Sequence, residues 1–164
     1  MKRQLELVRI RCEEDFRLFA QLAFNEQVMK MDMGRIFTQT EAEGYFAYML
    51  SYNQEHPNSG NYLAYRREDQ VFIGLAALWE REEGAELEYM VLPEYWNRGY
   101  ATEMVAQLLE QAQRIPDLTV VRGIMDPENT ASQRVLKHHG FTLETTMHVE
   151  EDDSTVAVYR RTCS

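Results

Sequence analysis

One stretch of the chain, residues 87–112, constrains the fold more than any other. It reads LEYMVLPEYWNRGYATEMVAQLLEQA, which is an apolar strand, a short turn containing a glycine, and then a helix. Apolar residues recur in the helix at i, i+3, i+4, i+7, i+8 and i+11, so they form one stripe at the helical period. They are Ala101, Met104, Val105, Leu108, Leu109 and Ala112. The stretch therefore predicts a strand–turn–helix unit at the centre of the fold.

The turn before this helix is a predicted anion-binding site. The first N–H groups of a helix lack intrahelical partners, and the helix dipole adds a partial positive charge there. Gly99 permits backbone angles that a side chain would forbid, and Arg98 adds a cation beside the turn. An ordinary strand–helix connection with a glycine is the alternative. The spacing matches neither a G-x-x-x-x-G-K-[ST] phosphate loop nor a G-x-G-x-x-G turn, which disfavours nucleoside triphosphates and nicotinamide cofactors.

Composition predicts an ordinary folded domain. The 164 residues are 45% hydrophobic, no apolar run reaches the length of a bilayer-spanning helix, and the N-terminus lacks the apolar core of a signal peptide. Cys12 and Cys163 are expected to be free thiols in a reducing compartment, so we expect a cytoplasmic protein without a membrane partner. The net charge of −10 disfavours nucleic acid and permits a cationic partner, such as an amine or a basic peptide.

The order of predicted elements is β-α-α-β-β-β-α-β-α-β-β, which indicates a mixed α/β fold with hairpins around a β-α-β centre. A first strand is predicted at 5–11, and a second helix from a Thr40–Glu43 capping box to about His56. Residues 25–37, rich in Met, fit no period. No repeat, linker or low-complexity stretch divides the chain, so residues 1–164 are expected to form a single domain.

Two motifs in series resemble those of the GNAT N-acetyltransferases. PEYWNRGYATEM, at 93–104, resembles the family's acetyl-CoA pyrophosphate turn, and DPENTASQRVLKHHGF, at 126–141, resembles its Asn-x-x-Ser…Gly-Phe helix. Within the superfamily the chain looks most like the branch of the RimJ/RimL-type ribosomal-protein N-terminal acetyltransferases. The resemblance implies a central, twisted, mostly antiparallel sheet with flanking helices. It also implies a parallel pair, the strand ending at Leu92 and the strand 118–125, that splays apart.

The resemblance implies where acetyl-CoA would bind. The pantetheine arm would pair with the main chain of 90–92, amides of 97–102 would cradle the pyrophosphate, and two residues of the last helix would hold the arm and line the thiol end. This set comprises Met90, Val91, Leu92, Asn97, Arg98, Gly99, Tyr100, Ala101, Thr102, Asn129 and Ser132. The chain departs from the family at Trp96, usually Gln or Arg, and at Asn97, frequently Gly. Simpler alternatives are a helix N-cap at Asn129 and a solvent-facing Ser132.

Transfer to a free amine needs a base, because a protonated amine must lose its proton before it attacks the thioester. Glu88 is the preferred base, since it lies closer to the expected splay than Glu86 on the same strand face, and His148 or water are alternatives. The polar face of a half-buried strand is the structural alternative for both glutamates. Many relatives place a Tyr acid one turn after the Ser position, where this chain has Leu136. The resemblance to the RimJ/RimL-type branch therefore implies Ser132 as the acid.

We therefore expect an acetyl-CoA-dependent N-acetyltransferase that transfers the acetyl group directly to a primary amine, on a peptide N-terminus or a small molecule. No spacing of His, Cys or Asp resembles a metal site, so no metal is expected. The rival hypothesis is a GNAT module that binds acyl-CoA without turnover, which the departures at Trp96, Asn97 and Leu136 keep open. The acceptor, the acyl-chain preference and the oligomeric state stay open, with a homodimer compatible with the family.

Overall fold

The computed structural model of the protein describes residues 3–32, 34–151 and 153–163. Within these residues, seven strands form one sheet in the order β1-β2-β3-β4-β5-β7-β6. The strands are β1 (Leu5–Arg9), β2 (Gly60–Arg66), β3 (Phe72–Arg81), β4 (Gly84–Val91), β5 (Val120–Met125), β6 (Thr142–Val149) and β7 (Ser154–Thr162). Neighbouring strands run antiparallel except β4 and β5, which run parallel. The predicted mixed α/β fold with a mostly antiparallel sheet is confirmed.

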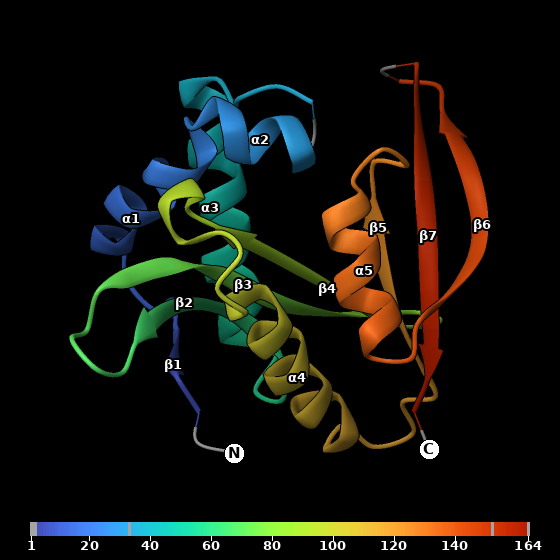
Figure 1. The fold of residues 1–164 in the computed structure, drawn as a ribbon. Helices are drawn as coiled ribbons and strands as arrows, with labels where there is room; N and C mark the ends of the chain where they lie inside the picture. The colour runs from blue at the N-terminus through green and yellow to red at the C-terminus, as the bar shows by residue number, and fades with distance from the viewer. Residues whose placement is uncertain (1–2, 33, 152, 164) are drawn as a thin grey trace.

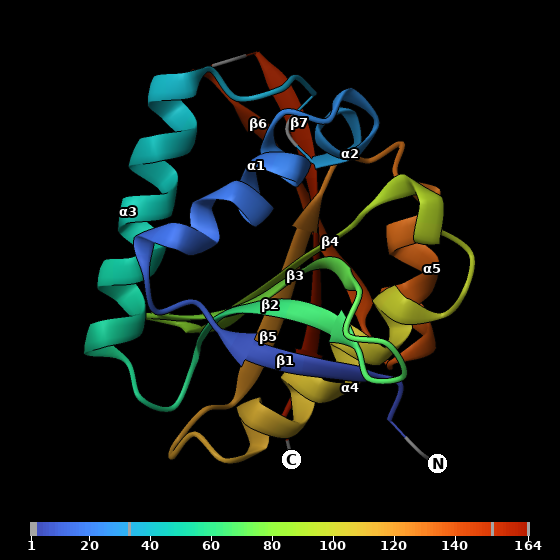
Figure 2. The same cartoon turned by 90° about the vertical axis from the view of Figure 1, so that its left-hand side faces the viewer.

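Helices cover both faces of the sheet (Figures 1 and 2). On one face lie α1 (Phe16–Ala23), α2 (Glu26–Asp32) and α3 (Gln39–Glu55), and on the other lie α4 (Tyr100–Gln113) and α5 (Thr130–His138). Short 3-10 helices, η1 (Glu13–Asp15) and η2 (Pro93–Tyr95), precede α1 and α4. In the described residues, no helix is both long and apolar enough to cross a membrane.

Each face of the sheet has its own hydrophobic core. Under α4 and α5, Leu87, Leu108 and Leu136 belong to one buried cluster, while Phe46 and Trp79 belong to a second cluster under α1–α3. Each such side chain contributes on the order of 1.5–3 kcal/mol when fully buried. Because successive residues of a strand point to opposite faces, β4 presents alternate side chains to the two layers. The site described below uses both faces of this one strand.

The strands β4 and β5 separate after a short paired segment. Three residue pairs set the parallel register: Ala85–Val121, Glu86–Arg122 and Leu87–Gly123. Beyond them β4 continues to Val91, and among the described strands none pairs with its β5-facing edge over 88–91. The predicted splay is therefore present. On the opposite edge of β4, a Cβ at Gly74 of β3 would lie 2.0 Å from the carbonyl oxygen of Met90, so only a glycine allows this close approach of the two strands.

Two local predictions are wrong in detail. The capping box of α3 is Thr38 with Glu41 rather than Thr40–Glu43: the Glu41 N–H donates to the Thr38 hydroxyl oxygen at 3.1 Å, and the Thr38 N–H donates to the Glu41 carboxylate at 2.9 Å. The helix begins two residues earlier because Thr38, with extended backbone angles, already supplies the cap. The predicted order of elements has two helices between the first two strands, whereas the structure has three, because α2 lies within residues 25–37. Its 7 residues are too few to show a helical period.

Candidate active site

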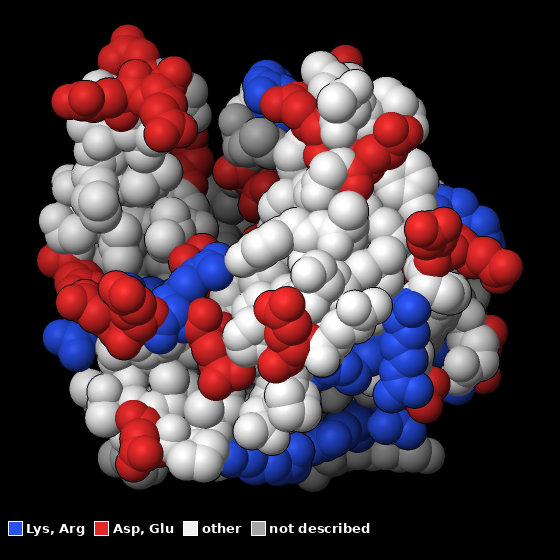
Figure 3. Space-filling view, turned by 180° about the vertical axis from the view of Figure 1, so that it is seen from behind, with Lys and Arg blue, Asp and Glu red and all other residues white. Residues whose placement is uncertain are grey.

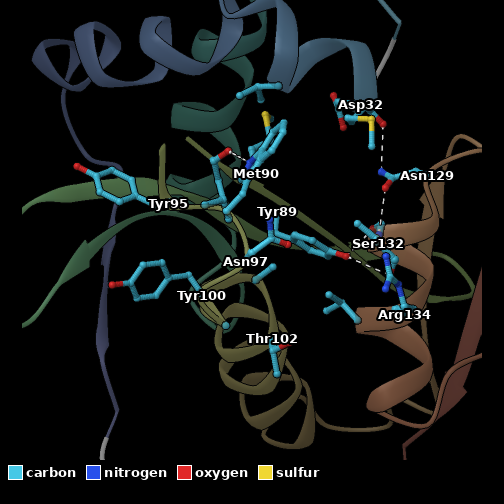
Figure 4. A pocket seen from close by; sticks show the side chains of 18 residues that line it. Asp32, Tyr89, Met90, Tyr95, Asn97, Tyr100, Thr102, Asn129, Ser132 and Arg134 are labelled. Carbon is cyan, nitrogen blue, oxygen red and sulfur yellow. Dashed lines mark hydrogen bonds between the residues drawn. The ribbon is translucent and has the colours of Figure 1, made fainter. Parts of the chain in front are cut away.

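A cavity of about 420 Å³ lies where β4, the start of α4 and α5 meet (Figure 4). Residues of α2 and of the turn between η2 and α4 complete its walls. Most of the residues predicted to bind the cofactor line this cavity: Met90, Val91, Asn97, Gly99, Tyr100, Ala101, Thr102, Asn129 and Ser132. The structure thus brings the two sequence motifs, some thirty residues apart, to one place.

Leu92 and Arg98, also predicted to bind the cofactor, are not among the described residues that line this cavity. The Leu92 N–H donates to the carbonyl oxygen of Ile73 on β3 at 2.9 Å, so this amide already has a partner. The Arg98 guanidinium lies over the ring of Tyr95, 5.8 Å from its centroid. A role for these two residues in binding stays a prediction.

The turn into α4 has the backbone shape of an anion site. Asn97 and Gly99 both adopt left-handed backbone angles, with φ of 63° and 84°. Asparagine tolerates this region better than most residues, which explains how Asn97 stands where the family frequently has glycine. Gly99 is the N-cap of α4, and within the described residues no side chain caps the helix. The amides of the first turn therefore remain available for an anionic group at the cavity.

Trp96 forms part of the cavity wall and occupies a main-chain acceptor of β4. Its indole N–H donates to the carbonyl oxygen of Val91 at 2.7 Å, and 38% of its surface is exposed. This carbonyl lies in the segment of β4 that has no β5 partner. A ligand amide that pairs with Val91 must share this acceptor with the indole or displace it.

The start of α5 is fixed by Asn129 and opens towards Tyr89. The Asn129 side-chain oxygen accepts from the Ser132 N–H at 3.0 Å, and its amide donates to the Met31 carbonyl at 3.3 Å, which ties α5 to α2. Asn129 is thus a helix cap as well as a lining residue. Ser132 does not simply face solvent, because its hydroxyl oxygen lies 2.5 Å from the phenol oxygen of Tyr89 (Figure 4).

Glu88 lies on the opposite face of β4 from Tyr89 and meets α3. A small cavity of about 40 Å³ is lined by Glu88, Ser132 and Asn129 together. The Tyr45 hydroxyl donates to both carboxylate oxygens of Glu88, at 3.0 and 3.2 Å. Burial, and next the negative charge of Asp32, raise the pKa of Glu88 to about 8, although the hydrogen bond from Tyr45 opposes this shift.

Other carboxylates surround Glu88. Asp32, the last residue of α2, lines the main cavity. Its side chain is exposed to solvent, yet the protein around the carboxyl group desolvates it enough to raise its pKa to about 6. Glu86 lies two residues before Glu88 and pairs with the Arg81 guanidinium at 3.4 Å. Seen from behind, a deep hollow between the β6–β7 side and the rest of the molecule has Asp and Glu side chains on its walls (Figure 3). This arrangement favours a cation as the ligand.

His148, the alternative base, lies on β6, where its Nε2 is 3.2 Å from the Asp153 carboxylate and its side chain is more than half exposed. It is not among the described residues that line either cavity.

Leu136 lies one turn after Ser132 and is fully buried. It packs so closely against β5 that a Cβ at Gly123 would lie 2.7 Å from its Cδ1. In the described part of the chain, no group of three or more His, Cys, Asp or Glu could hold a metal ion.

Three residues of the site were missed by the sequence analysis. The sequence analysis gave no role to Tyr45 or Tyr89, and Asp32 lies in the segment 25–37, which fits no period. The contacts that bring these tyrosines into the site join residues far apart in the sequence: Tyr45 and Glu88 are 43 residues apart, as are Tyr89 and Ser132. No spacing rule within one sequence connects such pairs.

In this fold, an uncapped helix start lies beside the unpaired edge of a splayed parallel strand pair, which suits a ligand with an anionic group and an extended arm. The acetyltransferase (GNAT) domain family matches residues 4–142, which is most of the chain. The chain therefore belongs to the GNAT acetyltransferase family, and both the predicted family and the N-acetyltransferase class of enzyme are confirmed.

Individual relatives agree with this assignment. The chain is similar to the N-acetyltransferase YoaA of Bacillus subtilis, with 31% identity over 72 residues, which cover 44% of this chain and 41% of YoaA. A Salmonella typhimurium acetyltransferase that modifies the N-terminal serine of a 50S ribosomal subunit protein has a similar structure, with TM-score 0.79 and 20% identity over 99% of this chain and 97% of that one. Spermidine N-acetyltransferase of Vibrio cholerae, in complex with CoA and spermine, gives TM-score 0.76 and 17% identity over 97% and 95%.

Proposed function

We propose that the protein transfers an acetyl group from acetyl-CoA directly to a primary amine. One observation carries this proposal: Glu88, whose pKa is raised to about 8, and Ser132 line the same small cavity beside the splay. A base and a hydroxyl on either side of one gap are what direct transfer to an amine requires. No covalent acyl-enzyme is involved in this proposal.

In this proposal the main cavity binds acetyl-CoA, the substrate that supplies the activated acetyl thioester. Amides at the start of α4, beside Gly99, would hold the pyrophosphate, because that helix start has no side-chain cap among the described residues. The unpaired edge of β4 at Met90 and Val91 would hold the pantetheine arm. Asn129 and Ser132, on α5, would line the thiol end. The structure of the Vibrio cholerae relative in complex with CoA supports this use of the fold.

Glu88 would accept the proton of the bound ammonium, directly or through a water. A base with a pKa of about 8 is ionised in a useful fraction near neutral pH and is basic enough to accept the proton. The double hydrogen bond from Tyr45 orients the carboxylate. The main-chain N–H groups near Met90 or Val91 would stabilise the negative charge that develops on the carbonyl oxygen.

A cationic acceptor fits the site best. The carboxylates of Asp32 and Glu86 place negative charge near Glu88, and Glu88 adds to this charge in the molecules in which it is ionised. The whole chain carries a net charge of −10. The polyamine bound to the Vibrio cholerae relative and the N-terminal serine modified by the Salmonella typhimurium relative represent the two acceptor classes that we propose.

Cys12 is an exposed free thiol and Cys163 is also free, which supports a cytoplasmic setting.

The test is release of free CoA thiol from acetyl-CoA in the presence of a panel of amines. The panel contains polyamines, amino acids, aminoglycosides and peptides with Ser, Ala or Met at the N-terminus. Each amine is paired with its own acetylated form, which has no free amine and serves as the matched control. We expect thiol release with at least one class of free amine and background release with its acetylated partner.

Calorimetric titration with acetyl-CoA separates the proposal from the rival module that binds acyl-CoA without turnover. Tight binding with no thiol release across the panel would favour the rival, which the hydrogen bond of Trp96 to the Val91 carbonyl also permits. Absence of binding would contradict the assignment of the cavity itself.

A further inference from the structure

The hydroxyl groups of Tyr89 and Ser132 meet across the splay. Tyr89 comes from β4 and Ser132 from α5, and their oxygen atoms are 2.5 Å apart, a short hydrogen bond. Both residues line the main cavity and also the small cavity that contains Glu88. The pair therefore lies where the two cavities meet, at the predicted thiol end of the cofactor site.

The chemistry of a leaving thiolate favours a phenol behind the serine. A serine hydroxyl is about as weak an acid as water, whose pKa is about 15.7, whereas a phenol has a pKa of about 10 and is much closer to that of a thiol. A proton donor works best when its pKa is close to that of the group it protonates. Ser132 alone would leave an alkoxide, and Tyr89 can prevent this.

Burial favours the protonated form of the Tyr89 hydroxyl. Desolvation raises the pKa of Tyr89 above the ordinary value for a phenol, and the hydrogen bond with Ser132 opposes this shift. The hydroxyl therefore remains protonated at neutral pH. The backbone N–H of Ser132 is bonded to Asn129, which fixes the position of the serine. The next inward-facing residue of α5, Leu136, is apolar and fully buried.

We propose that Tyr89 is a positioning residue that acts through Ser132 and replenishes the proton that Ser132 gives to the leaving thiolate. The inference rests on the proposed function. When the bond between the carbonyl carbon and sulfur breaks, the electron pair leaves with sulfur, which takes the Ser132 hydroxyl proton. The Ser132 oxygen takes the Tyr89 proton, and the phenolate then regains a proton from water in the open cavity.

The experiment compares Tyr89→Phe, Ser132→Ala and the double variant in steady-state thiol release. Tyr89→Phe keeps the ring and removes only the hydroxyl, so we expect kcat to fall about 10- to 100-fold while KM for acetyl-CoA stays within about twofold. Because the two residues act in series, the double variant should be no slower than Ser132→Ala. Tyr62→Phe is the matched control, since Tyr62 is buried, its hydroxyl bonds to Arg9 and Gln111, and it lies outside both cavities.

Solvent deuterium isotope effects distinguish a proton relay from a structural contact. In mixtures of H₂O and D₂O the wild-type rate should curve with deuterium fraction, because two protons move, and Tyr89→Phe should give a straight line. An unchanged kcat in Tyr89→Phe, equal curvature in both proteins, or multiplicative losses in the double variant would overturn the inference. Slow hydrolysis of acetyl-CoA, measured without an amine, uses the same leaving group. This hydrolysis therefore tests the role of Tyr89 even if no amine in the panel is acetylated. Failure of the amine panel would count against the proposed function and not against the role of Tyr89.

Discussion

The two halves of the proposed site are built in different ways. The proposed cofactor half is a contiguous backbone structure: the turn 93–99, with left-handed angles at Asn97 and Gly99, leads directly into the first turn of α4. The acceptor half is made of side chains from three elements, Asp32 of α2, Tyr45 of α3 and Glu88 of β4. Two elements contribute to both proposed halves: the edge of β4 lines the main cavity while Glu88 projects towards α3, and Asp32 of α2 lines the main cavity as well.

From this difference we expect the two halves to control different properties of the protein. A site made of main-chain groups depends on where the chain turns. Substitution of an exposed side chain such as Trp96 therefore alters the cavity wall but leaves the main-chain amides in place. A side-chain site depends on three elements packing in register, and a single substitution alters its charge. The cofactor half should therefore report on binding of acetyl-CoA, and the acceptor half on the rate of transfer and on the choice of amine.

The largest expected effect separates these halves. In Glu88→Gln the base is lost but the shape is kept, so we expect kcat to fall about 10²- to 10⁴-fold. The dissociation constant of acetyl-CoA, measured by calorimetry, should change less than about twofold. Glu68→Gln, in the exposed turn between β2 and β3, is the control and should leave both values unchanged. Loss of cofactor binding in Glu88→Gln would show that the halves are not separate.

The next effect concerns the backbone half. Gly99 and Gly140 have nearly the same left-handed φ, 84° and 85°, but Gly140 lies after the end of α5 and does not line the main cavity. Alanine at either position should lower the free energy of unfolding by about 1–2 kcal/mol, because L-residues avoid this region. Only Gly99→Ala should also weaken acetyl-CoA binding, by about tenfold, since the amides of α4 lose their alignment.

Chemical denaturation and calorimetry on the two glycine variants provide the comparison. Equal losses of affinity would contradict a backbone site at Gly99, as would unchanged affinity in both.

The sequence predicted the backbone half well and the side-chain half poorly. A strand, a glycine turn and a helical stripe lie within 87–112, so local periodicity and turn chemistry predicted an anion site at the Gly99 turn. The resemblance to the GNAT family added Asn97 and Thr102, and both line the same cavity as Gly99. Glu88 could be proposed from strand alternation. Its environment could not, because Tyr45 and Asp32 reach it only through the packing of α2 and α3 against the sheet.

Local register limited the remaining predictions. A capping box at Thr40–Glu43 and one at Thr38–Glu41 have the same residue types, and only the backbone angles of Thr38 decide between them. The short α2 shows no usable period over its 7 residues, so Asp32 could not be assigned to a helix end.

A smaller effect tests the electrostatics of the acceptor half. Glu88 must be ionised to accept a proton, so activity should rise with pH through its pKa of about 8. Asp32→Asn removes a neighbouring negative charge, which lowers the pKa of Glu88 and should move this limb to lower pH by up to about one unit. Tyr45→Phe removes a donor to the ionised form and should move the limb to higher pH. Profiles of kcat against pH at saturating amine test both signs, and shifts in the same direction would contradict them.

The smallest effect concerns the wall of the cofactor half. Trp96→Phe removes the indole N–H that bonds to the Val91 carbonyl, so we expect the affinity for acetyl-CoA to change only about two- to threefold. The chain has two tryptophans, and Trp79 is 2% exposed whereas Trp96 is 38% exposed. Addition of acetyl-CoA should therefore change the fluorescence of the wild type and leave that of Trp96→Phe nearly constant. A full signal in the variant would place the ligand away from Trp96.

The most direct test of the account is the ionisation of Glu88 itself, because an acceptor amine also titrates and can obscure a kinetic profile. Protein labelled with ¹³C at the Glu side-chain carboxyls is titrated by NMR, and the Glu88 signal is assigned by its absence in Glu88→Gln. The account predicts that the Glu88 carboxyl titrates near pH 8. A Glu88 signal that titrates near the ordinary glutamate pKa of about 4.3 would contradict a buried base at the splay.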